Sequence, residues 1–297
     1  MCTVGGIELC YETFGDSADP ALLLVMGLGT QMVWWRNEFC QQLAERGFHV
    51  VRYDNRDVGR SSRLHHAPLP TFWQLVRRDK RAASYTLADM AGDGVGLLDH
   101  LGVERAHVVG ISMGGMIAQT MAVEFRERVL SLVSIMSNTG SWRTGQPSLF
   151  AYPHFLSRAP AERESYVENS VRHFRRVASP AFEIDEHEHR LLAGHAFDRL
   201  HEPSESLRHL AAIIASGNRT PMLRTITAPT LVIHGAADRL VKPSGGRATA
   251  RAIPGAVLMM IEGMGHELPK GVWPQVIEAI ARNADRAGDP SRRESVA

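Results

Sequence analysis

The chain has 297 residues, 44% of them hydrophobic and 22% charged, which is ordinary for a globular protein that can bury a sizeable core. Its 33 Lys and Arg residues face 32 Asp and Glu residues, and a net charge of +1 gives no overall field to attract nucleic acid or an anionic membrane. The sequence has no apolar run of transmembrane length, no signal-peptide pattern in residues 1–15, and only three cysteines. These features exclude membrane channels, coiled coils and disulfide-rich miniproteins, and they predict a reduced, cytoplasmic protein built as one large α/β domain or about two smaller ones.

Apolar runs of strand length alternate with helical patterns through the first half of the chain. The runs predict buried strands at residues 22–26, 49–53, 106–111 and 130–136. The stretches between them predict helices at residues 36–46, 87–101 and 113–124, and Thr86 followed by Asp89 provides a capping box for the second helix. Fully apolar strands separated by helices predict a mostly parallel sheet that is covered on both faces.

The pattern changes after residue 138 and returns near residue 226. Between these points strand-like runs disappear, and helical segments rich in Arg, His and Glu are interrupted by irregularly spaced prolines. Strands at 230–234 and 257–261 and a helix at 274–283 then resume the α/β pattern. We therefore predict a core made of residues 1–138 and 226–297, a helical cap or lid of residues 139–225 inserted into it, and a frayed tail from residue 287.

The sharpest local motif is Gly110-Ile111-Ser112-Met113-Gly114, which follows a predicted strand and precedes a predicted helix. This is the setting of a nucleophile elbow, in which glycines allow a turn too tight for side chains on either side of the serine. The turn would place the Ser112 hydroxyl at a helix N-terminus, where the amides and the helix dipole favour a developing anion. The alternative is a glycine-rich turn with an idle serine.

A serine hydroxyl needs a base, and the base needs a carboxylate to orient it. In this kind of fold the order along the chain is Ser, acid, His. Asp238 follows the predicted strand 230–234, and His266 follows the predicted strand 257–261 in a glycine-rich turn. Each alone could be an ordinary loop residue, but together they predict a triad of Ser112, His266 and Asp238 at the carboxyl ends of the strands.

An oxyanion hole needs two backbone N–H groups aimed at one point. We expect one from Met113, directly after the nucleophile, and the other from Leu28, in the loop Met26-Gly27-Leu28-Gly29 after the first buried strand. The two glycines of that loop would let the backbone approach a substrate closely. A plain glycine turn is the alternative.

These segments, with Tyr53-Asp54-Asn55-Arg56-Asp57-Val58-Gly59-Arg60-Ser61, resemble the α/β-hydrolase family along most of the chain. Within that family the chain is most similar to bacterial esterases related to aclacinomycin methylesterase. The resemblance implies an α/β-hydrolase fold with a helical lid, a Ser112–His266–Asp238 triad, and hydrolysis of a small-molecule ester without a cofactor. One departure is Met26, where many relatives have His before the first oxyanion glycine, so polar support for this loop is expected to differ.

Other patterns point less clearly to function. His187 and His189 would lie on different sides of a helix, and no zinc-ligand spacing is present, so we predict no metal site. Trp34 and Trp35 fit a substrate pocket and core packing equally well. Asp54, Arg56 and Ser61 are expected to fasten the loop beside the active site.

The motifs predict a serine carboxylic ester hydrolase acting on small, largely apolar molecules. Ser112 argues against epoxide hydrolases and haloalkane dehalogenases, which share the fold but use Asp as the nucleophile. Carbon–carbon bond hydrolases and perhydrolases of this fold keep the serine triad, so they remain alternatives, as does a small-molecule receptor without turnover. No nucleic acid or membrane partner is expected, and the oligomeric state is left open.

Overall fold

A seven-stranded sheet runs through the centre of the protein, with the strand order β3-β5-β4-β6-β7-β8-β9. The structure is a computed structural model, and it describes residues 1–146, 148, 160–202 and 205–288. Strand β3 is antiparallel to β5, and the remaining neighbours pair in parallel. The strands are β3 (Tyr11–Phe14), β4 (Ala21–Val25), β5 (His49–Tyr53), β6 (Ala106–Ile111), β7 (Val129–Ile135), β8 (Thr230–Gly235) and β9 (Val257–Ile261).

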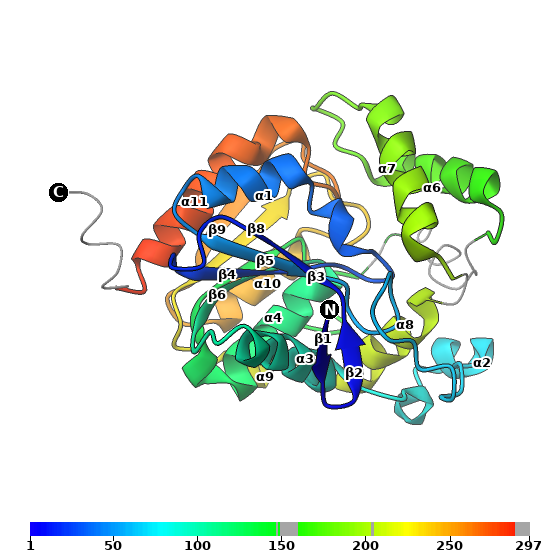
Figure 1. Cartoon of the computed structure of the whole chain (residues 1–297), viewed down its shortest axis with the longest axis horizontal. Helices are drawn as coiled ribbons and strands as arrows, with labels where there is room; N and C mark the ends of the chain where they lie inside the picture. Colours follow the sequence, from blue (N-terminus) through cyan, green and yellow to red (C-terminus); the bar gives the residue numbers. More distant parts are fainter. Residues whose placement is uncertain (147, 149–159, 203–204, 289–297) are drawn as a thin grey trace.

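Both faces of this sheet are buried by helices, because successive side chains of a strand point to opposite faces. In β4, Leu22 and Leu24 belong to one apolar cluster, whereas Leu23 and Val25 belong to the other. Figure 1 shows α1 and α11 on one side of the sheet and α3, α4 and α10 on the other. Their bounds are α1 (Asn37–Ala44), α3 (Leu87–His100), α4 (Met113–Glu124), α10 (Ser244–Ala252) and α11 (Trp273–Asp285). The predicted α/β-hydrolase architecture of a mostly parallel, doubly covered sheet is confirmed.

The predicted strands and helices of this core all form, with ends that shift by at most a few residues. The capping box is also present, since the Asp89 backbone N–H donates to Thr86 Oγ1 over 3.4 Å and the Thr86 N–H donates to the Asp89 carboxylate over 2.7 Å.

Three N-terminal strands and two helices of the described chain were not predicted from the sequence. The hairpin β1 (Cys2–Val4) and β2 (Ile7–Leu9) and the edge strand β3 have only three or four residues each, too few for a periodic pattern. Helix α2 (Phe72–Val76) is similarly short. Helix α10 begins Ser-Gly-Gly, a poor helix-forming sequence. Packing explains its second glycine, because a Cβ on Gly246 would lie 2.5 Å from His234 Nδ1.

Among the described residues, four helices lie between β7 and β8: α6 (Arg163–Val177), α7 (Glu186–Leu200), α8 (Glu205–Ser216) and α9 (Thr220–Leu223). In Figure 1, α6 and α7 stand together beyond the layers of the core, whereas α8 lies near α3. Ala212 of α8 is part of the buried core cluster, and Ser216 Oγ accepts a hydrogen bond from the Leu87 N–H. Helix α8 therefore packs against the core, and the helical cap of residues 139–225 stays a prediction.

Short 3₁₀ turns complete the described chain at Met32–Trp34, Lys80–Ala82, Arg126–Arg128 and Lys270–Val272. None of the helices among the described residues combines the length and apolarity required to cross a bilayer. Most of the tail predicted to be frayed, residues 289–297, lies outside the described residues.

Candidate active site

Ser112 occupies a strained turn between β6 and α4. Its backbone has φ 55° and ψ −119°, a region that non-glycine residues rarely adopt. A Cβ on Gly110 would lie 2.1 Å from the Gly114 carbonyl oxygen, and one on Gly114 would lie 2.1 Å from the Val25 carbonyl oxygen. The two glycines of the motif are thus required by backbone contacts, which is the physical reason expected for a nucleophile elbow.

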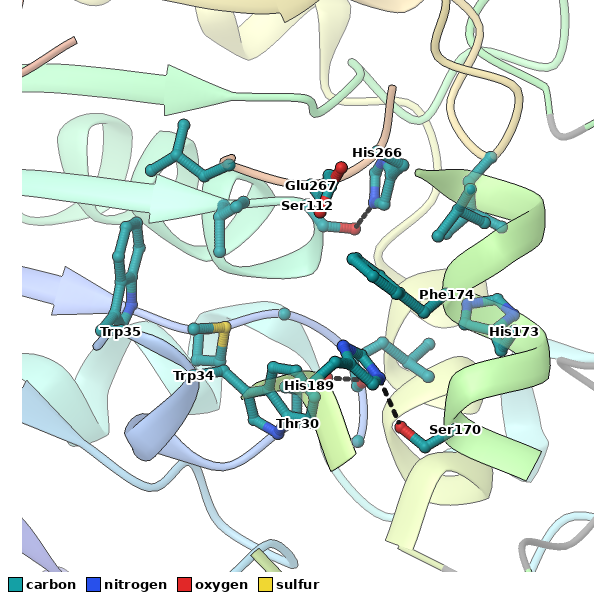
Figure 2. Close-up of a pocket in the computed structure, with 18 of the residues that line it drawn as sticks. Thr30, Trp34, Trp35, Ser112, Ser170, His173, Phe174, His189, His266 and Glu267 are labelled. Carbon is teal, nitrogen blue, oxygen red and sulfur yellow. Dashed lines mark hydrogen bonds between the residues drawn. The ribbon is translucent and has the colours of Figure 1, made fainter. Parts of the chain in front are cut away.

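Three residues from separate loops meet beside this turn. Ser112 Oγ lies 3.1 Å from His266 Nε2, the contact drawn in Figure 2. His266 Nδ1 lies 2.7 Å from Asp238 Oδ2. Strands β8 and β9 are neighbours, with Gly235 opposite Ile261, so the loops that follow them leave the same edge of the sheet. The structure therefore brings together all three side chains predicted as a triad.

Asp238 is held as a buried carboxylate. Its Oδ1 accepts hydrogen bonds from the Leu240 and Val241 N–H groups at 2.8 and 2.9 Å. Burial favours the neutral acid, but the charges and hydrogen bonds of His266 and His234 outweigh it, and the pKa of Asp238 falls to about 2. A carboxylate at Oδ2 requires His266 to donate from Nδ1, which leaves His266 Nε2 as an acceptor for the Ser112 hydroxyl proton.

The loop after β4 passes directly beside the serine. Strands β4 and β6 are adjacent, with Val25 opposite Gly110, although β5 lies between them in the sequence. This is a topological switch point, where ligands collect in open α/β sheets. A Cβ on Gly27 would lie 3.3 Å from Ser112 Cβ. Within the described part of the chain, the backbone N–H groups of Leu28 and Met113 donate no hydrogen bond, so both are available as the predicted oxyanion donors.

Buried polar contacts fasten this loop to the one after β5. Asn55 Nδ2 donates to the Met26 carbonyl over 3.0 Å, and the Met32 N–H donates to Asp54 Oδ1 over 2.7 Å. Ser61 Oγ donates to the Asp54 carbonyl over 2.6 Å, which agrees with the fastening role expected of both residues. Arg56 instead forms an ion pair with Asp93 of α3.

Helix α7 also takes part in this network, which no sequence motif predicted. Arg199 Nη2 lies 3.0 Å from Asp54 Oδ2, and both side chains are almost fully buried. Gln31 Nε2 in turn donates to the α7 carbonyls of Ala196 and Leu200 at 2.7 and 3.0 Å. Helix α7 is thus tied by a buried ion pair and several hydrogen bonds to the loops that adjoin Ser112.

A cavity of about 340 Å³ opens above Ser112 and His266. Six aromatic side chains line it: Trp34, Trp35, Phe39, Tyr166, Phe174 and Trp273. Figure 2 shows Phe174 reaching from α6 toward Ser112 and His266. Trp35 also stacks on Phe39 within the core, with ring centroids 5.6 Å apart. This tryptophan therefore both lines the pocket and packs in the core. The cavity wall is predominantly apolar. Its polar side chains lie at the elbow, on α6 and α7, and on other segments that contribute Thr30, Arg36, Glu202, Ser206 and Glu267.

His189 of α7 forms a polar point in the cavity wall. Its Nε2 lies 3.0 Å from Ser170 Oγ, and its ring stacks on Phe174 with centroids 4.1 Å apart (Figure 2). Burial, helped by the nearby charge of Arg36, lowers the pKa of His189 to about 4, so it is neutral at pH 7. The sequence pattern around His189 had raised only the question of a metal ligand. Among the described residues, no group of three or more His, Cys, Asp and Glu side chains could hold a metal ion.

The lowered pKa of His189 makes folding sensitive to acid. His189 binds its proton near pH 6.5 in the unfolded chain but only near pH 4 in the folded protein. Its contribution to the free energy of unfolding is therefore fully present above pH 6.5 and is lost as the pH drops toward 4. The loss attributable to this one group should reach about 3 kcal/mol. Urea unfolding of the wild type and His189→Gln at pH 4.5 and 7 measures it. The variant should lose less stability between these pH values, and equal losses would contradict the prediction.

The comparisons with known proteins agree with this architecture. A model of the alpha/beta hydrolase fold family matches residues 20–269. The chain belongs to this family. As an α/β hydrolase it is 32% identical to a rhodomycin D methylesterase of Streptomyces peucetius, over 97% of this chain and 98% of the relative. It is 28% identical to 3-oxoadipate enol-lactonase 2 of Acinetobacter baylyi, over 88% of this chain and 87% of the relative.

Among solved structures, this α/β hydrolase is similar to the enol-lactonase of Burkholderia xenovorans, with a TM-score of 0.70 and 25% identity over 94% of this chain and 97% of the other. The methylesterase and the lactonases are carboxylic ester hydrolases. These relatives bear out the prediction of a carboxylic ester hydrolase and the resemblance to methylesterases.

Proposed function

We propose that this α/β hydrolase cleaves carboxylic esters by serine catalysis, with Ser112 as nucleophile, His266 as general base and acid, and Asp238 as the group that orients His266. The observation that carries the proposal is the chain of contacts from Asp238 through His266 to Ser112, at 2.7 and 3.1 Å, on the floor of an aromatic cavity. The two available N–H groups of Leu28 and Met113 form the oxyanion hole in this proposal.

The chemistry proceeds in two halves. Ser112 Oγ bonds to the ester carbonyl carbon while its proton passes to His266 Nε2, and the carbonyl oxygen becomes an oxyanion held by the Leu28 and Met113 N–H groups. When the intermediate collapses, the carbon–oxygen bond to the alcohol breaks and His266 returns the proton to that alcohol. Water then gives a proton to His266 and attacks the acyl-enzyme carbonyl carbon. As the bond from this carbon to Ser112 Oγ breaks, His266 returns the proton to Oγ, which releases the carboxylic acid and restores Ser112. No step needs a cofactor.

The cavity supports a small, largely apolar substrate. Its six aromatic side chains offer flat apolar contact area, and its polar side chains include the Ser170–His189 pair. Since two relatives are named for methylesterase activity on rhodomycin D, we propose a methyl ester carried by an apolar molecule, with methanol as the leaving alcohol. Helices α6 and α7 supply one wall of the cavity, which is the role we propose for them as the cap within residues 139–225. The cytoplasmic location stays a prediction from the sequence.

A rapid-mixing assay on p-nitrophenyl esters from acetate to decanoate tests the mechanism. We expect a burst of p-nitrophenol close to one equivalent of enzyme wherever deacylation is slower than acylation, and mass spectrometry should place the acyl group on Ser112. The acyl chain length with the highest kcat/KM would indicate the length of the part of the cavity that binds the acyl group.

Other outcomes separate the alternatives. Ester turnover without acylation of Ser112 would contradict the proposal. Tight binding of these esters with no turnover by folded protein would favour a receptor. Cleavage of carbon–carbon bonds or formation of peracids, without hydrolysis of esters, would favour a carbon–carbon bond hydrolase or a perhydrolase, which use the serine triad in the same fold.

A further inference from the structure

The Leu28 N–H lies in the Gly27–Leu28 peptide plane, which joins the next plane, Leu28–Gly29, at the Leu28 Cα, so its direction depends on how both planes are held. The Gly27 carbonyl accepts the Thr30 N–H at 3.3 Å, and the Leu28 carbonyl accepts Thr30 Oγ1 at 2.9 Å. At the other side of the Leu28–Gly29 peptide, the Gly29 N–H donates to His209 Nδ1 over 3.1 Å. Gly29 has φ +61°, in the region that favours glycine. Hydrogen bonds therefore hold the Leu28–Gly29 peptide plane at its carbonyl and at its N–H. They restrict a plane that adjoins glycine, the residue with the widest conformational freedom.

The contacts of His209 define its protonation. Its Nε2 lies 2.7 Å from the Arg56 carbonyl oxygen, which can only accept, so Nε2 carries the proton. The Gly29 N–H can only donate, so Nδ1 is unprotonated. The side chain is therefore the neutral Nε2–H tautomer, and the residue is completely buried. A second proton on Nδ1 would face the Gly29 N–H and break that contact.

Helix α8 fixes this histidine firmly in place. The adjacent Arg208 forms a buried ion pair with Asp57, with nitrogen–oxygen distances of 2.9 and 3.0 Å. At the start of the helix, Ser206 Cβ would lie 3.0 Å from a Cβ on Gly29. One helix thus contacts both the loop after β4 and the loop after β5, and His209 hydrogen-bonds to each of them.

We propose that His209 is a positioning residue of the oxyanion hole: it holds the Gly29 N–H and thereby aims the neighbouring Leu28 N–H at the developing oxyanion. This inference rests on the proposed function. Without the imidazole acceptor, the part-buried Gly29 N–H loses its partner, and the Leu28–Gly29 peptide can rotate about ψ of Leu28 and φ of Gly29 to find another. That rotation shifts the backbone at Leu28 and with it the direction of the Leu28 N–H. The aim of the Leu28 N–H matters when charge builds up on the substrate oxygen, so His209 acts on kcat and leaves KM nearly unchanged.

Two substitutions separate the two hydrogen bonds of His209. Asparagine places its Oδ1 where Nδ1 stands and can accept from Gly29, but it does not reach the Arg56 carbonyl. Glutamine can reach the Arg56 carbonyl with its Nε2 but has no acceptor at the Nδ1 position. We expect His209→Gln to lower kcat by about 10- to 100-fold, since a donor displaced by about 1 Å can cost 10²-fold. His209→Asn should stay within about fivefold of the wild type, and KM should change less than about threefold in both variants.

Rates are expressed per active serine, titrated with a fluorophosphonate, so that loss of folded protein does not count as loss of catalysis. A trifluoromethyl ketone, which forms a tetrahedral adduct with an oxyanion on Ser112, should lose affinity in His209→Gln in parallel with kcat/KM. His107→Gln is the matched control, because His107 is also a buried, hydrogen-bonded histidine but lies near the start of β6. Its kcat per active serine should equal that of the wild type.

Equal kcat values for the wild type and His209→Gln would overturn the inference, as would equal losses in the asparagine and glutamine variants. The proposed function fails separately: in that case Ser112 would not be acylated in the wild-type protein. A normal wild-type burst together with a fully active His209→Gln would therefore refute the role of His209 alone.

Discussion

The Ser112→Ala variant should have a kcat at least about 10³-fold below that of the wild type on any ester that the protein hydrolyses. The substitution removes the atom that would bond to the substrate carbonyl and leaves His266 and the proposed oxyanion donors in place. Some rate over uncatalysed hydrolysis should survive, because the hole can still stabilise attack by water. Steady-state hydrolysis of p-nitrophenyl esters measures the loss, and KM should change far less than kcat.

The fold should tolerate this change. Alanine keeps the same backbone restrictions as serine at φ 55°, so the strain of the turn is neither relieved nor increased, and stability should stay within about 1 kcal/mol. Ser131→Ala is a suitable control, because it also deletes a serine hydroxyl, one that is buried within the sheet and contacts His107 Nδ1 at 2.9 Å. Its kcat should match that of the wild type. Activity of Ser112→Ala within about tenfold of the wild type would rule out Ser112 as the nucleophile.

The residues of the candidate triad could be predicted because each follows a strand. The apolar runs that precede Ser112, Asp238 and His266 locate these side chains at one edge of a parallel sheet. The order Ser, acid, His along the chain then identifies them as one triad. The two proposed oxyanion donors follow from the same rule, since Leu28 and Met113 also come directly after strands, and β4 and β6 are neighbours in the sheet. The sequence therefore predicts the part of the site that lies in short loops directly after the strands.

The supporting residues could not be predicted, because they lie on helices whose positions depend on tertiary packing. His209 contacts Gly29 across 180 positions of sequence, and Arg199 contacts Asp54 across 145. Neither residue belongs to a motif with fixed spacing, and the helical pattern around them only predicts that they are helical. His189 is similar: its partner Ser170 lies on another helix, and the packing of α6 against α7 brings the two together.

The Asp238→Asn variant should lose about 10³- to 10⁴-fold in kcat with its site otherwise intact. Two backbone N–H groups, those of Leu240 and Val241, point at Oδ1, so the amide oxygen of asparagine takes that position. Its NH₂ group then takes the place of Oδ2, 2.7 Å from His266 Nδ1, and donates to that nitrogen. His266 must carry its proton on Nε2 instead, and in that tautomer it cannot accept the proton of the Ser112 hydroxyl.

Three measurements test this consequence of the Asp238 geometry. Ester hydrolysis should show the loss in kcat, and acylation of Ser112 by a fluorophosphonate should slow to a similar degree, because both need His266 Nε2 as an acceptor. Nitrogen NMR of the labelled histidines should show the His266 proton moving from Nδ1 to Nε2. Asp99→Asn, which changes a largely exposed carboxylate at the end of α3, should leave all three readouts unchanged. Full kcat in Asp238→Asn, with the proton on Nε2, would show that Ser112 is activated by some group other than His266.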